Sequence, residues 1–302
     1  MPIAVEWLPA RLSPMLRARG HLRRIATSAA LLVALCLVAL AGVIPAKAAE
    51  PTFYYLSLGD SLAYGLDVQQ LMNELSAGTF SPASFNHGYT DLLAARLGTF
   101  ASGIQVVNYG CPGTNPDVFL YSPCGFGLPL HNAFAGTQMD AALAFIGAHP
   151  GAIALITLDL DVGEPEMGQL VNYCNFVPTC VQMWLPTALS YLKVRLDTIF
   201  QKLRAAAPNV MIVVNTAYNP YSTVAPWTDM VVLGGNNTLT TSAQAAGLRV
   251  ADMFPPFDLG VDRNATLCSL LYFCQAPLYD VHPTPLGYSV MASTMWSATG
   301  WP

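Results

Sequence analysis

The sequence predicts an α/β fold in which a parallel sheet of five strands is covered by helices on both faces. Two observations support this prediction. Short, nearly continuous apolar segments alternate with segments of helical periodicity. Glycine or proline also marks the ends of the helical segments, as at Pro208 and Gly247. The chain has 302 residues, and about 250 remain after an N-terminal leader, which suits a single α/β domain.

The expected elements follow in order along the chain. The strands are expected at Phe53–Leu58, Gln105–Tyr109, Ile153–Leu160, Val210–Asn215 and Leu248–Met253. The helices between them are expected at Tyr89–Leu97, Thr137–Ala148, Leu185–Ala207 and Thr240–Ala246. His282–Trp296 is expected to form a closing helix, with prolines at its start, where proline is tolerated. Two cysteine-containing segments, Gly110–Asn132 and Gly163–Trp184, are expected to be long loops stapled by disulfides.

Residues 1–48 are predicted to be a secretory signal peptide. Five arginines and one acid occupy residues 1–24, an apolar run covers Ile25–Ile44, and Ala46-Lys47-Ala48 forms a small-x-small cleavage site. An uncleaved membrane anchor is the alternative, because about 20 apolar residues can span a bilayer. Residues 49–302 are then expected to form one secreted, extracellular domain, which meets a membrane only transiently, through the leader or a lipid substrate.

The charge balance argues against a nucleic-acid partner. The formal net charge is −5, and much of the basic charge lies in the predicted leader. The rest of the chain is acidic and contains no run of Lys or Arg, which excludes the basic footprint of a nucleic-acid-binding protein.

The cysteines predict three disulfides. Apart from Cys36 in the leader there are six: Cys111, Cys124, Cys174, Cys180, Cys268 and Cys274. An even number behind a signal peptide is typical of disulfides, and six cysteines allow 15 connectivities. Pairing of neighbours (111–124, 174–180, 268–274) is favoured, because each pair lies in a loop-like stretch containing Pro or Gly.

No metal or organic cofactor is expected. The cysteine spacings do not resemble a zinc site, since no C-x2-C pair occurs. The acidic stretch Asp159–Glu166 resembles a calcium loop only faintly, because its glycine stands one place early and the later spacing fails.

Ser61 is the candidate nucleophile. The first expected strand ends in Leu58-Gly59-Asp60-Ser61-Leu62. A serine directly after a buried strand, at a glycine-containing turn that opens a helix, has an exposed hydroxyl close to free backbone N–H groups. The alternative is that Asp60 or Ser61 only caps the helix.

His282 is the candidate general base. It lies in Tyr279-Asp280-Val281-His282-Pro283, which places a carboxylate beside an imidazole ahead of the last helix. A nucleophilic serine needs a base that takes its proton, and the base needs a partner that fixes its tautomer. The other four histidines lack this combination, although His282 could also be a solvated or helix-capping residue.

These motifs resemble those of the GDSL/SGNH hydrolase family, particularly its secreted, disulfide-bonded bacterial lipases and esterases. The nucleophile block is Tyr55-Leu56-Ser57-Leu58-Gly59-Asp60-Ser61, and the base block is Asp280-Val281-His282-Pro283. Asn108-Tyr109-Gly110-Cys111-Pro112-Gly113 is similar to the second block. The three cysteine pairs recur in those lipases, so the resemblance spans essentially the whole chain after the leader.

The resemblance implies a flavodoxin-like three-layer α/β/α sandwich and a role for each matching residue. Ser61 is the nucleophile, and its backbone N–H donates to the oxyanion. Gly113 is the second backbone donor, with Gly110 as the less favoured alternative. His282 is the general base and Asp280 the acid that orients it. The implied activity is hydrolysis of a small-molecule ester or lipid through an acyl-serine intermediate.

The sequence departs from the family pattern in two places. The third block, usually Gly-x-Asn-Asp, reads Asp161-Val162-Gly163-Glu164, so Gly163 stands in the place of an asparagine that donates to the oxyanion. Loss of one such donor costs about 10²–10³ in rate. The orienting acid usually stands three residues before the histidine, whereas Asp280 stands two before it. The alternative function is therefore a weak or inactive member that keeps the fold as a binding protein.

Apolar side chains in the expected loops are candidates for binding an acyl chain, although most are expected to pack those loops onto the sheet. They are Phe119, Leu120, Phe126, Leu128, Phe176, Trp184 and Trp227.

Overall fold

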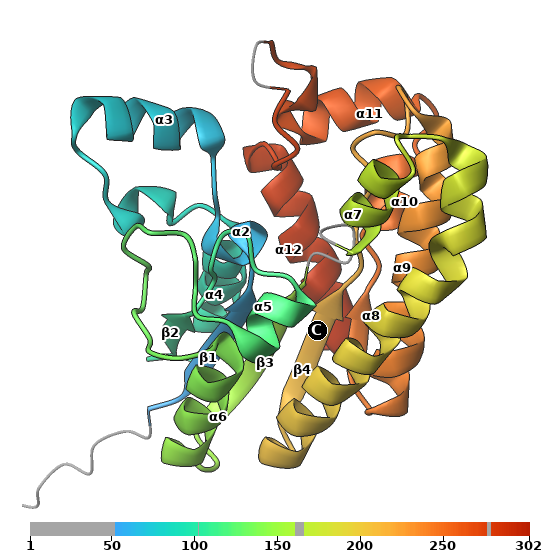
Figure 1. The fold of residues 1–302 in the computed structure, drawn as a ribbon. Helices are drawn as coiled ribbons and strands as arrows, with labels where there is room; N and C mark the ends of the chain where they lie inside the picture. Colours follow the sequence, from blue (N-terminus) through green and yellow to red (C-terminus); the bar gives the residue numbers. More distant parts are fainter. Residues whose placement is uncertain (1–51, 102, 161–165, 277–278) are drawn as a thin grey trace, which may run out of the picture. The chain divides into compact units, whose positions relative to one another are not determined.

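A five-stranded parallel sheet forms the centre of the fold (Figure 1). The computed structural model describes residues 52–101, 103–160, 166–276 and 279–302. The strands are β1 (Tyr54–Gly59), β2 (Gln105–Asn108), β3 (Ile153–Asp159), β4 (Met211–Asn215) and β5 (Arg249–Ala251). They pair in the order β2-β1-β3-β4-β5, and every neighbouring pair is parallel. The predicted α/β fold with a five-stranded parallel sheet is confirmed.

Helices connect the strands in the expected alternation. Between β1 and β3 lie α2 (Ser61–Tyr64), α3 (Val68–Ala77), η1 (Pro82–Phe85), α4 (Tyr89–Phe100), α5 (Pro116–Tyr121) and α6 (Gln138–Ala148). Between β3 and β5 lie α7 (Glu166–Tyr173), α8 (Pro178–Ala206), η2 (Pro226–Thr228) and α9 (Asp229–Ala245). After β5 follow α10 (Phe254–Asp258), α11 (Arg263–Leu270), η3 (Tyr272–Cys274) and α12 (Pro285–Thr299).

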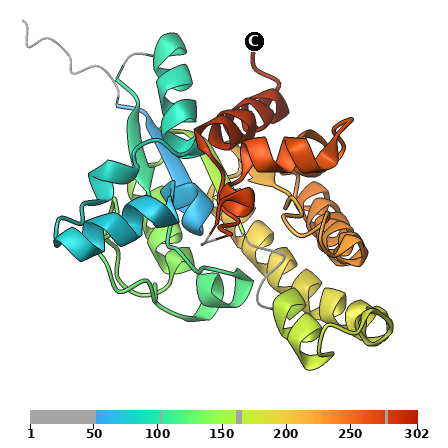
Figure 2. The same cartoon turned by 90° about the horizontal axis from the view of Figure 1, so that it is seen from above.

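The helices cover the two faces of the sheet with two separate hydrophobic clusters. On one face, side chains of α5, α6, α8 and α9 pack against the strands, with Leu56 and Ile156 at the centre. On the other face, α4, α11 and α12 pack around Tyr55 and Leu155. Alternate residues of each strand therefore point into opposite clusters, as the period of two requires. Figures 1 and 2 show α4 and α12 side by side on one side of the sheet, which gives the three layers.

Two segments predicted to be loops contain helices. In Gly110–Asn132, α5 forms because Asn115 caps it, accepting hydrogen bonds from two backbone N–H groups, and Pro116 occupies the first helical position. In the described part of Gly163–Trp184, α7 and the first two turns of α8 form. The prediction that the helix begins at Leu185 was wrong, because α8 begins at Pro178 and continues through Pro186.

Helix α9 begins 11 residues before the predicted start at Thr240. Its sequence was misleading because consecutive glycines, at 234 and 235, disfavour a helix by about 1 kcal/mol each. Gly234 is useful to the packing here. A Cβ atom built on it would lie 3.1 Å from a methyl group of Leu189 in α8, so the small residue allows the two helices to approach closely.

All described strands and helices lie in one compact unit, Pro51–Pro302. Within the described residues, no helix combines the length and apolarity needed to cross a bilayer. The predicted leader, 1–48, lies outside the described residues.

Candidate active site

The candidate nucleophile lies at the carboxyl edge of the sheet, where the strand order reverses. The connection after β1 leads to β2 on one side, whereas the connection after β3 leads to β4 on the other side, so the strand order reverses between β1 and β3. Ligand sites of open α/β sheets form outside the carboxyl ends of the strands at such a point. Ser61 follows the last residue of β1 by two positions and opens α2.

A glycine is required at the end of β1. Gly59 has a φ of +132°, and a Cβ atom built on it would lie 2.1 Å from the carbonyl oxygen of Asp159 in the neighbouring strand. Asp60 then caps α2, because its Oδ1 accepts a hydrogen bond of 2.7 Å from the backbone N–H of Leu62. Asp60 is therefore the capping residue, and the hydroxyl of Ser61 is left for other contacts.

The structure brings Ser61, His282 and Asp280 into one hydrogen-bonded chain. Ser61 Oγ lies 2.9 Å from His282 Nε2. The other ring nitrogen, His282 Nδ1, lies 2.5 Å from Asp280 Oδ1. That same carboxylate oxygen also accepts a 3.1 Å hydrogen bond from the backbone N–H of His282. An ionised Asp280 selects the tautomer that carries its proton on Nδ1 and leaves Nε2 free to accept the serine proton.

Asp280 remains a carboxylate although its surroundings are partly dry. Burial acts to raise its pKa, but hydrogen bonds and charge interaction with His282 outweigh burial, so the pKa of Asp280 lies below its ordinary value. The side chains of Asp280 and His282 are 7% and 15% exposed. The shorter spacing of two residues therefore brings the carboxylate to the imidazole.

The backbone of the base loop is held from another part of the chain. Tyr218, in the loop after β4, donates a 2.8 Å hydrogen bond from its hydroxyl to the carbonyl oxygen of Val281. The Tyr218 ring stacks on Phe257, with centroids 4.5 Å apart. On the other side, the backbone N–H of Tyr272 donates to the carbonyl oxygen of His282 at 3.0 Å. These contacts hold the carbonyl groups of Val281 and His282 in place.

An ionic network lies next to Tyr218 in the sequence. The backbone N–H of Asn219 donates to Asp258 Oδ2 at 2.8 Å. Arg263 donates to Asp258 at 2.8 Å and to Asp229 at 2.6 Å. Burial raises the pKa of Asp258 although Arg263 and the Asn219 amide oppose the shift. Charged groups thus support the loop that carries Tyr218.

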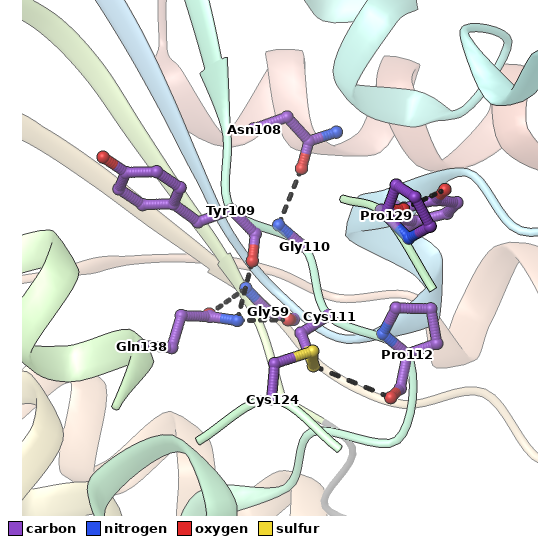
Figure 3. The surroundings of a disulfide bond; sticks show 10 residues. Gly59, Asn108, Tyr109, Gly110, Cys111, Pro112, Cys124, Pro129 and Gln138 are labelled. Atoms are coloured by element: carbon purple, nitrogen blue, oxygen red, sulfur yellow. Dashed lines mark hydrogen bonds between the residues drawn. A yellow bond between two sulfur atoms is a disulfide. The ribbon is translucent and has the colours of Figure 1, made fainter. Parts of the chain in front are cut away.

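Neutral amide side chains support the nucleophile side. The buried side chain of Gln138, at the start of α6, accepts a 2.7 Å hydrogen bond from the backbone N–H of Gly59 and donates 2.9 Å hydrogen bonds to the carbonyl oxygens of Gly59 and Tyr109 (Figure 3). Gln138 therefore ties the end of β1 to the chain that leaves β2.

Asn108, the last residue of β2, contacts Gly110, one of the two glycines expected to donate to an oxyanion. Its Oδ1 accepts a 2.8 Å hydrogen bond from the backbone N–H of Gly110 (Figure 3). Its Nδ2 donates to the carbonyl oxygen of Ala63. The Gly110 N–H is therefore already used. Among the described residues, the backbone N–H groups of Ser61 and Gly113 make no hydrogen bond, which favours Gly113 as the second donor.

Gly113 lies in a turn that needs glycine. The N–H of Thr114 donates to the carbonyl oxygen of Cys111 at 3.0 Å, Pro112 takes the second place of the turn, and Gly113 takes the third with a φ of +83°. This is the pattern of a type II turn. A disulfide between Cys111 and Cys124 joins the start of the turn to the segment after α5 (Figure 3).

All three cysteine pairs lie at disulfide distance in the pairing that was favoured from the sequence. The Cα–Cα distances are 5.9 Å for Cys111–Cys124, 5.4 Å for Cys174–Cys180 and 5.2 Å for Cys268–Cys274, within the usual range.

A family model describes this chain from residue 57 to residue 290, and its family is the GDSL-like lipase/acylhydrolase family. The chain belongs to this family. The match includes both the nucleophile block and the base block. A search of curated proteins found no match.

Solved structures of bacterial and metagenomic lipases share the fold. An extracellular lipase from Streptomyces rimosus and a phospholipase A1 from Streptomyces albidoflavus NA297 each have a TM-score of 0.54 and 17% sequence identity, with 82% of this chain and 99% of the other covered. A lipase from a goat rumen metagenome has a TM-score of 0.53 and 17% identity, with 82% and 97% covered. The resemblance stated from the motifs is confirmed.

The altered third block of the family pattern, Asp161-Val162-Gly163-Glu164, lies outside the described residues. The sequence analysis named Asn108 only as part of the second block, without a role, and it missed Gln138 and Tyr218. A glutamine among the apolar residues of the α6 segment was a signal for a buried polar contact. Tyr218 gave no such signal, because its partner, Val281, is 63 residues away.

Proposed function

We propose that this protein is a secreted serine esterase or lipase that hydrolyses carboxylic esters through an acyl-serine intermediate. The observation that carries the proposal is the hydrogen-bonded chain from Ser61 through His282 to Asp280. Membership of the GDSL-like lipase/acylhydrolase family supports a hydrolase.

In the acylation step, Ser61 Oγ attacks the ester carbonyl carbon while His282 Nε2 takes the hydroxyl proton. Asp280 stabilises the imidazolium that forms and keeps the ring in place. When the tetrahedral intermediate collapses, the bond between the carbonyl carbon and the alcohol oxygen breaks, and His282 returns the proton to the departing alcohol. An acyl group is left on Ser61.

In the deacylation step, His282 takes a proton from water, and the resulting hydroxide attacks the acyl carbon. The bond to Ser61 Oγ then breaks and the serine regains its proton, which releases a carboxylic acid and the starting enzyme. The backbone N–H groups of Ser61 and Gly113 are the proposed donors to the oxyanion in both steps. Donors that are fixed before the reaction need no reorganisation when charge develops, which is why such sites accelerate acyl transfer.

A small-molecule ester or lipid is the proposed substrate, and export to an oxidising compartment is the proposed destination. The leader composition and the three cysteine pairs at disulfide distance support export. The mass of the exported protein tests this, because cleavage after Ala48 leaves Ala49 as its first residue.

Hydrolysis of p-nitrophenyl acetate and longer-chain p-nitrophenyl esters by residues 49–302 tests the proposed reaction. We expect activity that falls by at least about 10⁴-fold in Ser61→Ala with an unchanged unfolding temperature. Folded protein without activity towards any of these esters would instead support a binding protein. Activity that survives in Ser61→Ala would exclude Ser61 as the nucleophile.

A further inference from the structure

The longest uncharged surface element of the chain lies beside the proposed catalytic edge. Residues 167–192 contain no Asp, Glu, Lys, Arg or His. They form most of α7 and the first half of α8, and the Cys174–Cys180 disulfide closes the turn between the two helices. The surface of a soluble protein usually mixes both signs of charge along such a length, so this hairpin is unusual.

The inner and outer sides of the hairpin differ in burial. On the inner side, Leu170 and Val181 are buried against Val231 of α9. On the outer side, large apolar side chains face solvent at the turn and the start of α8. They are Tyr173, Phe176, Val177, Met183 and Trp184, hereafter the hairpin tip. Contiguous exposed apolar residues of this kind mark an interaction site, whereas single ones do not.

The backbone at Phe176 is strained without any gain in burial. Asn175 has a φ of +48° and Phe176 a φ of +59°. Asparagine tolerates this left-handed region, but a bulky aromatic residue adopts it rarely and at a cost. The Phe176 side chain is nevertheless 65% exposed. Packing in the folded chain therefore does not explain a phenylalanine at this position, and strain of this kind points to a role outside the fold.

The hairpin tip lies at the same end of the sheet as Ser61. α8 leads back to the start of β4, so its first residue, Pro178, lies towards the carboxyl edge (Figure 1). In Figure 2 the hairpin projects at the lower right, next to α5. A groove of about 400 Å³ runs between α5, α7 and α8. Leu170, Tyr173 and Trp184 line it on the hairpin side, and the ion pair of Asp117 with Arg195 lines it next to α5. α5 begins three residues after Gly113, the proposed oxyanion donor.

The chemistry of the hairpin tip indicates its partner. A surface without charge gives no attraction to a polyanion or to an oppositely charged protein. Tyr and Trp with Phe and Met neighbours are the side chains that favour the boundary between lipid and water. We propose that the hairpin tip inserts into the surface of a neutral or zwitterionic lipid aggregate and so places the groove against the lipid. This inference rests on the proposed function, which supplies an ester or lipid substrate.

Vesicle sedimentation tests the inference. Residues 49–302 are used, because Pro51–Pro302 contain every described strand and helix as one compact unit. Ser61→Ala protein is mixed with phosphatidylcholine vesicles to exclude hydrolysis. We expect binding that 0.5 M NaCl does not weaken, because burial of apolar surface drives it. We also expect a blue shift of tryptophan fluorescence that is lost in Trp184→Phe.

The decisive variant is Phe176→Asn/Met183→Ser in the same background. It is expected to lower the vesicle partition coefficient at least about tenfold, the effect of one buried aromatic side chain. Its unfolding temperature should be equal or higher, because asparagine tolerates the positive φ. The matched control is Phe100→Ser. Phe100 is 61% exposed at the end of α4, at the opposite edge of the sheet, and its replacement should leave binding unchanged.

Four results would overturn the inference: no binding of the parent protein, unchanged binding of the double variant, binding that requires anionic phosphatidylglycerol, or a dimer in sedimentation equilibrium that the double variant dissociates. The last result would assign the hairpin tip to a second copy of the chain.

Hydrolysis of soluble p-nitrophenyl acetate by Val177→Ser/Met183→Ser with Ser61 intact should stay within about twofold of the parent, because both side chains face solvent at the hairpin tip. If the parent protein with Ser61 intact does not hydrolyse p-nitrophenyl acetate, the proposed function is rejected but the lipid contact is not.

Discussion

Ser61 and His282 meet at one hydrogen bond, but an inner strand of the sheet, β1, positions Ser61, whereas a loop positions His282. On the nucleophile side, Gly59 still belongs to β1, and the Gln138 amide holds both its backbone N–H and its carbonyl. On the base side, the Tyr218 hydroxyl holds the backbone at Val281.

The difference shows that one site can combine a nucleophile held rigidly by a strand with a base held by a less constrained loop. Neutral amides bonded to the backbone of a buried strand leave little room for movement and do not respond to pH. The base loop is held through two carbonyl groups, by the Tyr218 hydroxyl at Val281 and by the Tyr272 N–H at His282. The loop that carries Tyr218 contacts the charged residue Asp258 through the backbone N–H of Asn219. Disturbances on the nucleophile side should therefore destabilise the fold as well as lower activity, whereas those on the base side should act mainly on turnover.

Replacement of the orienting acid should give the largest effect on activity. Asp280→Asn is expected to lower kcat/KM about 10³–10⁴-fold, because an amide no longer enforces the tautomer that leaves Nε2 free. Ester kinetics at constant pH measure this loss. A loss below about tenfold would mean that the carboxylate does not orient His282.

The pH dependence of stability in Asp280→Asn gives a second test of the base side. The pKa of Asp280 is lowered from its ordinary value of 3.8, so its ionised form stabilises the folded state above about pH 4. This stabilisation is lost as the pH falls through the lowered pKa. The stability difference between parent and Asp280→Asn, measured by urea unfolding, should therefore be constant above about pH 5 and shrink below about pH 4. A difference that grows towards acid pH would contradict the assignment.

Removal of the Gln138 side-chain amide should lower both stability and activity more than any other change on the nucleophile side. Gln138→Met leaves the N–H of Gly59 and the carbonyls of Gly59 and Tyr109 without this partner. We expect a loss of about 2–4 kcal/mol in the free energy of unfolding, together with at least a tenfold fall in kcat. Gln105→Met is the matched control, because Gln105 is exposed on β2, and it should change stability by less than about 0.5 kcal/mol. A Gln138→Met protein that is inactive but as stable as the parent would contradict the expectation that changes on the nucleophile side destabilise the fold.

Removal of a single hydroxyl on the base side should have the smallest effect. Tyr218→Phe keeps the stack on Phe257 and loses the hydrogen bond to Val281. We expect a fall of about 3–10-fold in kcat with an unchanged KM, and a stability loss of about 1 kcal/mol. The control is Tyr121→Phe, whose hydroxyl lies on an exposed residue of α5. Equal kcat values for the two variants would show that Tyr218 does not position the base.

The sequence predicted the strands well because each is a buried apolar run. All five strands lie within two residues of their predicted bounds, although β5 is three residues long rather than six. Helices in the cysteine-rich segments were missed because short helices such as α5 depend on a cap and on packing against α8 more than on periodicity.

The residues of the site also fall into those that local sequence patterns predict and those that only the tertiary structure reveals. Gly59, Ser61 and His282 were predictable because the proposed reaction requires those residue types in those local patterns. Gln138 and Tyr218 were not, because each acts on backbone that lies more than 60 residues away in the sequence. Only the tertiary structure brings these partners together.

Labelling with a fluorophosphonate tests the central claim most directly. Folded residues 49–302 should gain one equivalent of the phosphonyl group, located by peptide mass spectrometry on Ser61. His282→Ala should lose the labelling while it keeps its unfolding temperature, because a serine without its base is a poor nucleophile. Folded protein that stays unlabelled, or that carries the label at another residue, would contradict the assignment of Ser61 and His282 as nucleophile and base.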